Sequence, residues 1–520
     1  MARQGLTATL LFAVLVATFG TWFPMGYIIV AMNGPQTAVV NWIRSVHCAR
    51  LGGIFCTEES SLGGCSDNYT EQVPSLDLWC KHYSEEEETN ILGDNPELNT
   101  FWAISSSFLN VGGLISSFAC TAIANKFGLK GAFYILAALY ITGTLTVCLA
   151  PLAGLFEMLV VGRTIIGLSL GSMCIIAPLY TAELTPPSVR GALGTLPIVT
   201  YVLGFIVATS AGFPMALGTE TGWPILVGLG LIPIVLLCVL LPFCPDSPRR
   251  LLIKKQNKAA AEKALRWLRK TSNVHDELAA MQEDFAAESG RPRVSLRSVF
   301  NDPILRSGLT MVAVAMLAQQ FSGYSALSFY STSIFSSIGM SRMDANVTTL
   351  GLWVTYLIFS LISMVLVEKS GRRTLLLWSH VLMMATMTAL VIFMILSKQG
   401  VTWTKYGSAA CVVMYIAVFA AGSASVPWIL PSELVTAEFR ASAMQLAGLM
   451  SWSGALIVTF IFPVLVTSLH EYVFLVFIGC GVVGTGYIFM KLPETKGKTI
   501  EEIQAVMRGN RGGRRSVARG

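Results

Sequence analysis

Residues 131–154 read GAFYILAALYITGTLTVCLAPLAG, a run without a single charged side chain. A helix needs about 20 apolar residues to cross the roughly 30 Å hydrocarbon core of a bilayer, so this run predicts a transmembrane helix. The composition of the whole chain agrees, because 53% of its 520 residues are hydrophobic and only 13% are charged, with a mean hydropathy of +0.63. We therefore expect an integral membrane protein rather than a soluble domain.

Apolar stretches of similar length recur on both sides of this run. The break from Pro151 to Gly154 separates it from the next stretch, and the first stretch is too long and too poor in cleavage-site residues for a signal peptide. We predict an all-α membrane protein with twelve transmembrane helices, at residues 7–32, 99–124, 131–154, 157–179, 191–213, 223–244, 304–328, 349–367, 374–396, 404–430, 442–466 and 471–491.

The charged residues predict the orientation. The segment 33–98 carries eleven acidic and three basic residues, whereas the segment 245–303 carries twelve basic residues. Because short cytoplasmic loops retain Lys and Arg, the second segment and the Arg-rich tail belong inside, and both termini are then cytoplasmic. We expect a multi-pass protein of the plasma membrane.

The loops assigned to the outside carry features of exported segments. Asn68-Tyr69-Thr70 and Asn346-Val347-Thr348 match the acceptor pattern for N-glycosylation, so Asn68 and Asn346 are the expected sites. Four of the eleven cysteines lie in the first loop, where two disulfides with three possible pairings are expected, namely Cys48, Cys56, Cys65 and Cys80. The other seven have no metal-ligand spacing, so we interpret them as packing residues.

An internal repeat divides the chain into two halves. Glu183 precedes Arg190 by seven residues after the fourth predicted span, and Glu433 precedes Arg440 by seven after the tenth, 250 residues later. Two like halves imply a cleft between them. The predicted domains are a six-helix bundle at 1–244 with the outer loop 33–98, a cytoplasmic linker with short helices at 245–303, a second six-helix bundle at 304–491, and a cytoplasmic tail at 492–520.

Charged residues at the inner helix ends can pair in one conformation and separate when that side opens. We assign such a cytoplasmic gate to Lys126, Arg163, Glu183, Arg190, Glu368, Arg372, Arg373, Glu433 and Arg440. Arg163 lies inside an apolar span, where a charge needs a partner or an interface. The alternative is that these residues are positive-inside anchors and exposed pairs worth about 0 to 1 kcal/mol each.

The chain resembles the sugar porter branch of the major facilitator superfamily, and in particular the facilitative glucose and fructose transporters of animals. The resemblance covers nearly the whole chain and implies two pseudo-symmetric six-helix bundles that work by alternating access. The resemblance rests on the motifs Gly162-Arg163, Tyr180-x2-Glu183 with Arg190-Gly191, Pro245-Asp246-Ser247-Pro248-Arg249, Gln319-Gln320-x2-Gly323, Gly371-Arg372-Arg373, Pro427-Trp428 and Pro493-Glu494-Thr495-Lys496-Gly497.

The resemblance also implies a binding site. Gln319 and Gln320 would hydrogen-bond sugar hydroxyls, Tyr330 would help close an outer lid, and Trp428 and Trp452 would line the cavity. The alternatives are that the glutamines join helices within the bundle and that the tryptophans anchor the protein at the lipid interface.

Several predicted pocket positions depart from the family pattern. Ile198 stands where sugar porters usually have Gln, and Ser325, Tyr356 and Ser451 stand where Asn is expected. Each buried hydroxyl left unpaired costs about 1–3 kcal/mol, so these changes question hexose specificity. Proton-linked members place a carboxylate at the position of Ile28, so we expect a passive uniporter.

We therefore expect a facilitative transporter of a hexose or related small solute, with no cofactor and no metal. The alternatives are a transporter of another solute, such as urate, a polyol or a vitamin-like compound, and a non-transporting nutrient receptor. An enzyme is not expected, because no triad, metal cluster or phosphate-binding loop lies in a water-exposed segment. The expected partners are a sugar-like solute and membrane lipid, without nucleic acid; a monomer is sufficient.

Overall fold

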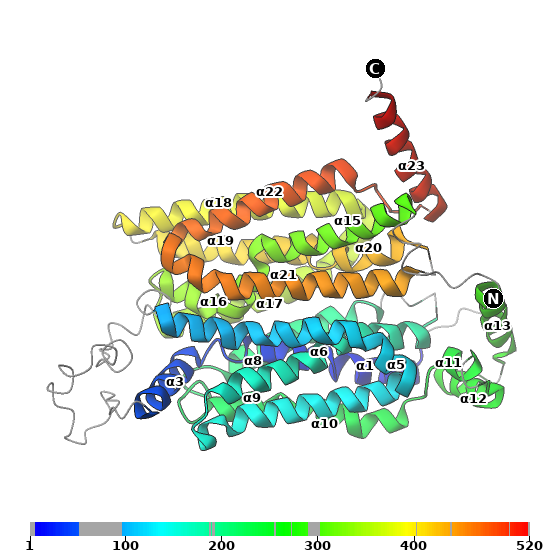
Figure 1. Cartoon of the computed structure of the whole chain (residues 1–520), viewed down its shortest axis with the longest axis horizontal. Helices are drawn as coiled ribbons and strands as arrows, with labels where there is room; N and C mark the ends of the chain where they lie inside the picture. Colours follow the sequence, from blue (N-terminus) through cyan, green and yellow to red (C-terminus); the bar gives the residue numbers. More distant parts are fainter. Residues whose placement is uncertain are drawn as a thin grey trace.

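The computed structural model describes residues 6–50, 96–186, 189, 193–253, 256–271, 273–289, 302–401, 403–436, 439–498 and 500–517. Within these ranges the chain is built from helices and contains no β-strand. The helices form two bundles that lie one above the other in Figure 1. This agrees with the all-α class predicted from the apolar stretches.

The first bundle comes from the N-terminal half and is the lower one in Figure 1. Outside it, α3 (Gln36–Arg50) leads away from the end of the first span. The bundle contains α1 (Ala8–Phe19), α2 (Trp22–Val30), α5 (Pro96–Ala153), α6 (Glu157–Leu184), α8 (Leu196–Ala211), α9 (Trp223–Leu229) and α10 (Leu231–Leu240), which continues into the short η3 (Leu241–Phe243).

The second bundle comes from the C-terminal half. Two of its spans contain a π-helical turn, a feature that is frequent at functional sites. Its elements are α15 (Pro303–Gln319), η4 (Gln320–Tyr324), α16 (Ser325–Ser337), α17 (Arg342–Ser370), α18 (Arg372–Lys398), α19 (Thr404–Val418), η5 (Phe419–Ser423), α20 (Val426–Leu434), α21 (Arg440–Leu469), η7 (His470–Tyr472) and α22 (Val473–Lys491).

The twelve-span prediction is confirmed. Nine segments of the described chain are long and apolar enough to cross a bilayer. Two of them, Thr100–Ala153 and Ser442–Lys491, each contain two spans, and the shorter α8 supplies the remaining one. The seventh span is longer than predicted, since α16 continues to Ser337, and the eighth begins earlier, at Arg342. The sequence did not reveal the extension of α16, because Ser328, Ser331, Thr332 and Ser333 lower its hydropathy although the helix is buried on nearly all sides.

Corresponding turns in the two halves have the same backbone geometry. Gly128 interrupts α5 with φ 83° and ψ 168°, and Gly371 separates α17 from α18 with φ 88° and ψ 157°. A positive φ of this kind is readily accessible only to glycine. The repeat seen in the sequence therefore corresponds to a repeat in the fold.

Glycines let α5 and α6 approach closely. A Cβ atom on Gly167 would lie 2.0 Å from the carbonyl oxygen of Leu109, and one on Gly171 would lie 2.3 Å from that of Gly113. Such contacts are possible only without a side chain. Gly167 and Gly171 of α6 therefore pack directly against the backbone of α5.

Helices of the linker lie at one end of the first bundle, and this end of the molecule is called the linker end below. They are α11 (Pro248–Ile253), α12 (Lys258–Arg269) and α13 (His275–Ser289), and α23 (Ile500–Val517) lies at the same end (Figure 1). Thr9 of α1 donates a hydrogen bond to the carbonyl oxygen of Trp267 at 2.8 Å, so α12 is attached to the first bundle. The opposite end, next to α3, is called the first-loop end.

Candidate functional site

A cavity of about 330 Å³ lies between the two bundles. This volume falls in the range of roughly 300–1,000 Å³ typical of small-molecule sites. Both halves contribute to its walls, and of the described residues that line it none is Asp, Glu, His, Lys or Arg. The lining includes all seven residues expected to bind substrate: Gln319, Gln320, Ser325, Tyr356, Trp428, Ser451 and Trp452.

The cavity extends towards the linker end. There its lining includes Thr185, directly after α6, Thr195, directly before α8, and Met444, in the first turns of α21. These residues lie at helix ends, so the cavity runs from the middle of the molecule to that end.

Hydrogen bonds between the bundles close the first-loop end. Asn33, just after α2, donates through Nδ2 to the carbonyl oxygen of Ser328 at 2.9 Å and to Ser331 Oγ at 3.1 Å. Ser333 donates to Oε1 of Gln36. These contacts join the first span to α16, so the molecule is in a conformation that is closed at the first-loop end.

Tyr330, the expected lid residue, lies within α16 at this closed end. Its backbone leaves helical geometry, with φ −132°, and its side chain is fully buried. The hydroxyl donates to the carbonyl oxygen of Thr459 in α21 at 2.9 Å, and the ring packs against Phe462. In this conformation Tyr330 joins two helices of the second bundle.

Gln319 bridges the seventh and tenth spans. Its Nε2 donates to the carbonyl oxygens of Ser423 at 2.6 Å and Ala424 at 3.2 Å. In a continuous α-helix the Ser423 carbonyl would bond to the N–H of residue 427, but Pro427 has none. The Ala424 carbonyl would bond to the N–H of Trp428, which instead donates to the carbonyl oxygen of Ser425. The amide therefore satisfies two acceptors that the break between η5 and α20 leaves without a helical partner.

Gln320 is held within the same layer. Its Nε2 donates to Ser451 Oγ at 3.0 Å and to Oε1 of Gln319 at 3.4 Å, while its Oε1 accepts from Ser325 Oγ at 2.5 Å. Two of the three residues found in place of the expected asparagines, Ser325 and Ser451, thus contact Gln320. The pocket amides are linked to each other and to α21.

A buried histidine extends this network beyond the cavity. Nδ1 of His380 in α18 lies 2.9 Å from the carbonyl oxygen of Leu376 and 3.1 Å from Ser423 Oγ. Ser379 Oγ lies 2.8 Å from the same Ser423 hydroxyl. Because the Leu376 carbonyl can only accept, we assign the proton to Nδ1. Sequence reasoning missed His380, although an ionisable side chain within an apolar span is a signal that could have found it.

One wall of the cavity is aromatic. Tyr201 of α8 and Tyr324 of η4 lie with their hydroxyl oxygens 3.2 Å apart, which joins the two bundles. The ring of Tyr324 stacks on Phe419 with a centroid distance of 4.1 Å, and Tyr356 meets Tyr324 edge to face at 6.2 Å. Ile198 also lines the cavity. Tyr201 and Tyr324 were not among the residues predicted from the sequence.

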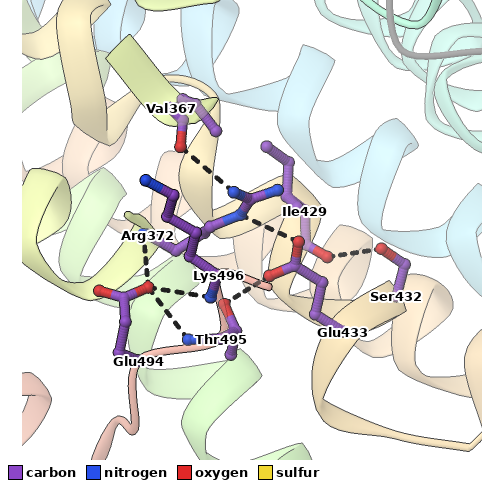
Figure 2. A network of polar contacts seen from close by, with 8 residues as sticks. All are labelled: Val367, Arg372, Ile429, Ser432, Glu433, Glu494, Thr495 and Lys496. Atoms are coloured by element: carbon purple, nitrogen blue, oxygen red, sulfur yellow. Dashed lines mark hydrogen bonds and ion pairs between the residues drawn. The ribbon is translucent and has the colours of Figure 1, made fainter. Parts of the chain in front are cut away.

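At the linker end, gate residues of the second bundle form one network (Figure 2). Nε of Arg372 lies 3.0 Å from Oε1 of Glu433, and Thr495 Oγ1 donates to Oε2 of Glu433 at 2.5 Å. Glu494 accepts from the backbone N–H groups of Arg372 at 2.8 Å and Thr374 at 3.3 Å. This carboxylate therefore occupies the N-terminus of α18, where exposed N–H groups favour an anion.

The Glu494 carboxylate responds to these contacts. Burial alone would raise its pKa, but the backbone N–H groups of Lys496, Arg372, Thr374 and Thr495 stabilise the charged form. The net effect is a pKa below the ordinary value of 4.5. Sequence reasoning did not assign Glu494 to the gate.

The other expected gate residues of this end are more peripheral. Arg373 donates to the carbonyl oxygen of Phe489 at 2.7 Å, and Lys126 lies over the ring of Phe127 at 5.3 Å. Glu368 and Arg440 are exposed. Of the predicted residues, the structure thus brings Arg372 and Glu433 into direct contact.

In the first bundle the corresponding region involves the linker. Glu183 is half-buried in the last turn of α6, and Arg190 lies outside the described residues. The buried Arg269 of α12 donates to the carbonyl oxygen of Leu184 at 2.9 Å and forms an ion pair with the half-buried Glu277 at 2.8 Å. Arg269 and Glu277 were not predicted to lie here, because they are far from α6 in the sequence and no motif links them to it.

Arg163 does not join the gate at the linker end, and its assignment there needs correction. It lies six residues after Glu157, the first residue of α6, and that glutamate pairs with Arg50 of α3 at the first-loop end. The guanidinium is buried and its Nη1 lies 3.0 Å from the sulfur of Met32. Because the start of α6 lies at the first-loop end, Arg163 is far from the linker end where the gate was expected.

The structure also bears on the expected modifications. Asn346 is fully buried in the first turns of α17 and donates to the carbonyl oxygen of Arg342 at 2.8 Å, so it cannot accept a glycan in this fold. Asn68, Cys56, Cys65 and Cys80 lie outside the described residues, and so does the side chain of Cys48. The other seven cysteines are free.

Within the described ranges, no cluster of three or more His, Cys, Asp or Glu side chains could hold a metal ion. The described residues that line the cavity offer hydrogen bonding by amides, hydroxyls and indoles, together with contact to aromatic rings. Such a lining suits reversible binding of a neutral small molecule.

Comparison with known proteins gives matches over nearly the whole chain. The family model described as "Sugar (and other) transporter" matches residues 13–507. Facilitated glucose transporter member 2 of Rattus norvegicus is 32% identical over 514 residues, covering 98% of this chain and 96% of the relative. Facilitated glucose transporter member 3 of Homo sapiens is 31% identical over 512 residues, covering 98% and 94%.

Solved structures show the same fold. The major facilitator superfamily proton:xylose symporter XylE bound to 6-bromo-6-deoxy-D-glucose has a TM-score of 0.71 and 22% sequence identity, with coverage of 96% of this chain and 99% of the other. An inward-open conformation of XylE from E. coli also has a TM-score of 0.71, with 21% identity and coverage of 96% and 99%.

Proposed function

The chain belongs to the sugar transporter family and has the major facilitator fold, and on this premise we propose that it is a facilitative uniporter for a hexose or related small solute. Its relatives are transporters and not enzymes. The solute would bind in the cavity between the bundles and leave on the other side after the bundles rock.

The lining of the cavity carries the proposal of uniport. Coupling to protons needs a group that takes up and releases the proton along the solute path, usually a carboxylate. None of the described lining residues is Asp, Glu or His. At the first-span position where a carboxylate would be expected in a coupled transporter, Ile28 is buried among apolar neighbours.

The experiment is uptake into proteoliposomes that enclose a pH-sensitive dye. We expect saturable entry of a labelled hexose or deoxyhexose down its gradient, without acidification of the lumen. The matched control is Trp428→Ala, which removes a ring from the cavity and should abolish saturable uptake. Acidification that depends on an inward sugar gradient would contradict uniport while leaving transport itself intact.

The seven predicted cavity residues are proposed to hold the solute. The indoles of Trp428 and Trp452 would cover apolar faces of the ring, and the carbonyl oxygens of Gln319 and Gln320 would accept from its hydroxyls. These roles rest on the shared position of the residues around one cavity.

Helix α20 offers a physical link between the cavity and the gate. Trp428 lies in the cavity, and Glu433, five residues further along the same short helix, pairs with Arg372 at the linker end. A tilt of α20 would move both side chains together. We propose that closure around the solute reaches the gate through this helix, with Tyr330 closing the first-loop end.

The orientation and location belong to the same proposal. Because basic residues collect in the linker, the linker end would face the cytoplasm, in the plasma membrane, with both termini inside. The domains would be 1–244, 245–303, 304–491 and 492–520. Glycosylation would be confined to Asn68, and loss of a glycosidase-sensitive mass in Asn68→Gln would test this.

An organic anion such as urate is a weaker candidate. A buried anion needs a cation or several fixed donors near it. No Lys, Arg or His is found among the described residues that line the cavity. A neutral solute therefore fits the site better.

A further inference from the structure

We propose that the site prefers monosaccharides lacking one or more hydroxyl groups over fully hydroxylated hexoses. This inference rests on the proposed transport function and names the solute class of the same cavity. It follows from two features of the cavity. The amide hydrogens of Gln319 and Gln320 already bond to other groups of the protein, and one wall consists of aromatic and alkyl side chains that include Ile198.

The first argument is that the amide hydrogens of the glutamine pair are all engaged. Gln319 Nε2 uses its two hydrogens on the Ser423 and Ala424 carbonyls, and Gln320 Nε2 uses its two on Ser451 Oγ and on Gln319 Oε1. An amide nitrogen has no further hydrogen to donate. Towards a solute the pair presents only the remaining acceptor capacity of its oxygens.

The second argument is that Gln319 is costly to release. The Ser423 carbonyl has no backbone donor at residue 427, because Pro427 lacks an N–H. The Ala424 carbonyl lacks its helical donor too, because the N–H of Trp428 bonds to Ser425. If Gln319 turned towards a sugar hydroxyl, both buried carbonyls would lose their partner. The amide is therefore a structural brace of the tenth span in this conformation.

The third argument concerns the aromatic wall of the cavity, where polar groups are few and partly paired. The hydroxyls of Tyr201 and Tyr324 hydrogen-bond to each other at 3.2 Å, and the Tyr324 ring stacks on Phe419. Ile198 adds an alkyl side chain to the same lining. Aromatic and alkyl surfaces favour the C–H faces of a ring and offer little to an extra hydroxyl.

Together these features penalise each hydroxyl that reaches this wall without a partner. An unpaired buried hydroxyl lowers affinity by about 5- to 150-fold. A deoxy sugar that lacks the hydroxyl at the matching position avoids the penalty and keeps contact with the indoles of Trp428 and Trp452. The absence of charged side chains from the described lining excludes charged sugars such as sugar phosphates by the same reasoning.

The test is competition in proteoliposomes. Uptake of labelled 2-deoxy-D-glucose is measured against unlabelled D-glucose, 2-deoxy-D-glucose, 3-deoxy-D-glucose and 6-deoxy-D-glucose. We expect at least one deoxy compound to inhibit at a concentration about tenfold or more below that of D-glucose. Equal or stronger inhibition by D-glucose than by every deoxy compound would overturn this inference alone. Failure of every sugar to enter or compete would overturn the proposed function as well.

A gain-of-function variant gives an independent readout. Ile198→Gln places a free amide on the aromatic and alkyl wall, so it should improve inhibition by D-glucose at least fivefold relative to the preferred deoxy compound. The matched control is Ser210→Gln, which adds the same amide to α8 at an exposed position outside the cavity lining. An unchanged ratio in a well-expressed Ile198→Gln protein, or the same change in Ser210→Gln, would count against the inference.

Discussion

The side-chain nitrogen of Gln319 lies 2.6 Å from the carbonyl oxygen of Ser423 and so ties the seventh span to the broken tenth span. Immediately after this break, α20 carries Trp428 into the cavity and Glu433 into the gate network. A residue expected from sequence to bind the solute thus also supports the helix that connects the cavity to the linker end.

Replacing Gln319 with Leu should lower both stability and transport. The substitution leaves the carbonyls of Ser423 and Ala424 without a partner, at a cost of about 1–3 kcal/mol each. We expect a lower melting temperature of the purified protein and at least a tenfold lower maximal uptake rate. Gln320→Leu, which leaves both carbonyls paired, should destabilise the protein less. Equal melting temperatures for the two variants would refute the bracing role.

His380 should act on the cavity as a positioning residue through Ser423. Loss of the Nδ1 contact in His380→Leu removes about 1 kcal/mol of hydrogen bonding, so the KM for sugar should rise about fivefold with little change in maximal rate. His380→Asn keeps a donor at the δ position and should restore the KM. A loss of maximal rate and protein yield in both variants would indicate a purely structural role.

The transmembrane fold could largely be predicted from the sequence. Uncharged runs such as 131–154 can be recognised without knowledge of tertiary contacts, because lipid forces each span to satisfy its own backbone. The repeat of Glu183 and Arg190 as Glu433 and Arg440 likewise indicated the two halves. The exception was the seventh span, where the polar residues of 328–333 lie in a helix buried by its neighbours. Hydropathy identifies helices whose surfaces face lipid, and α16 has little surface exposed to lipid.

The site was predictable only in part, for physical reasons. Resemblance placed Gln319 and Trp428 at the cavity, but the direction of the Gln319 amide depends on the missing N–H of Pro427 in another span. Likewise, a matching sequon does not show that Asn346 is buried in a helix. The Arg269–Glu277 pair depends on how the linker folds back onto α6, which no local pattern encodes.

The Arg372–Glu433 pair should contribute measurably to the stability of the second bundle. Both side chains are about one fifth exposed, with values of 19% and 21%, so solvent screens the pair only partly. A double-mutant cycle with Arg372→Gln and Glu433→Gln should give a coupling energy of roughly 1 kcal/mol in unfolding experiments. A coupling energy of zero would reduce the pair to a surface contact.

Glu494 should make the protein less stable in acid. Its folded-state pKa is below the ordinary value of 4.5, so its contribution is fully present above that value. The stabilisation is lost as the pH falls through the lowered folded-state pKa. Melting temperatures recorded from pH 7 to pH 3 should therefore fall in this acidic window, and Glu494→Gln should flatten the fall. An identical pH profile for the variant would contradict the capping role of this carboxylate at α18.

The most direct test of alternating access is a reversible lock at the first-loop end. Asn33 and Ser331 lie in different bundles with Nδ2 and Oγ 3.1 Å apart, so the thiols of the double variant Asn33→Cys with Ser331→Cys should be within reach of a short, reducible bis-methanethiosulfonate cross-linker in the closed conformation. We predict that cross-linking of this double variant stops sugar uptake in proteoliposomes and that reduction restores it, while each single variant stays active after the same treatment. Full uptake by the cross-linked protein would contradict a solute path through the cavity between the two bundles.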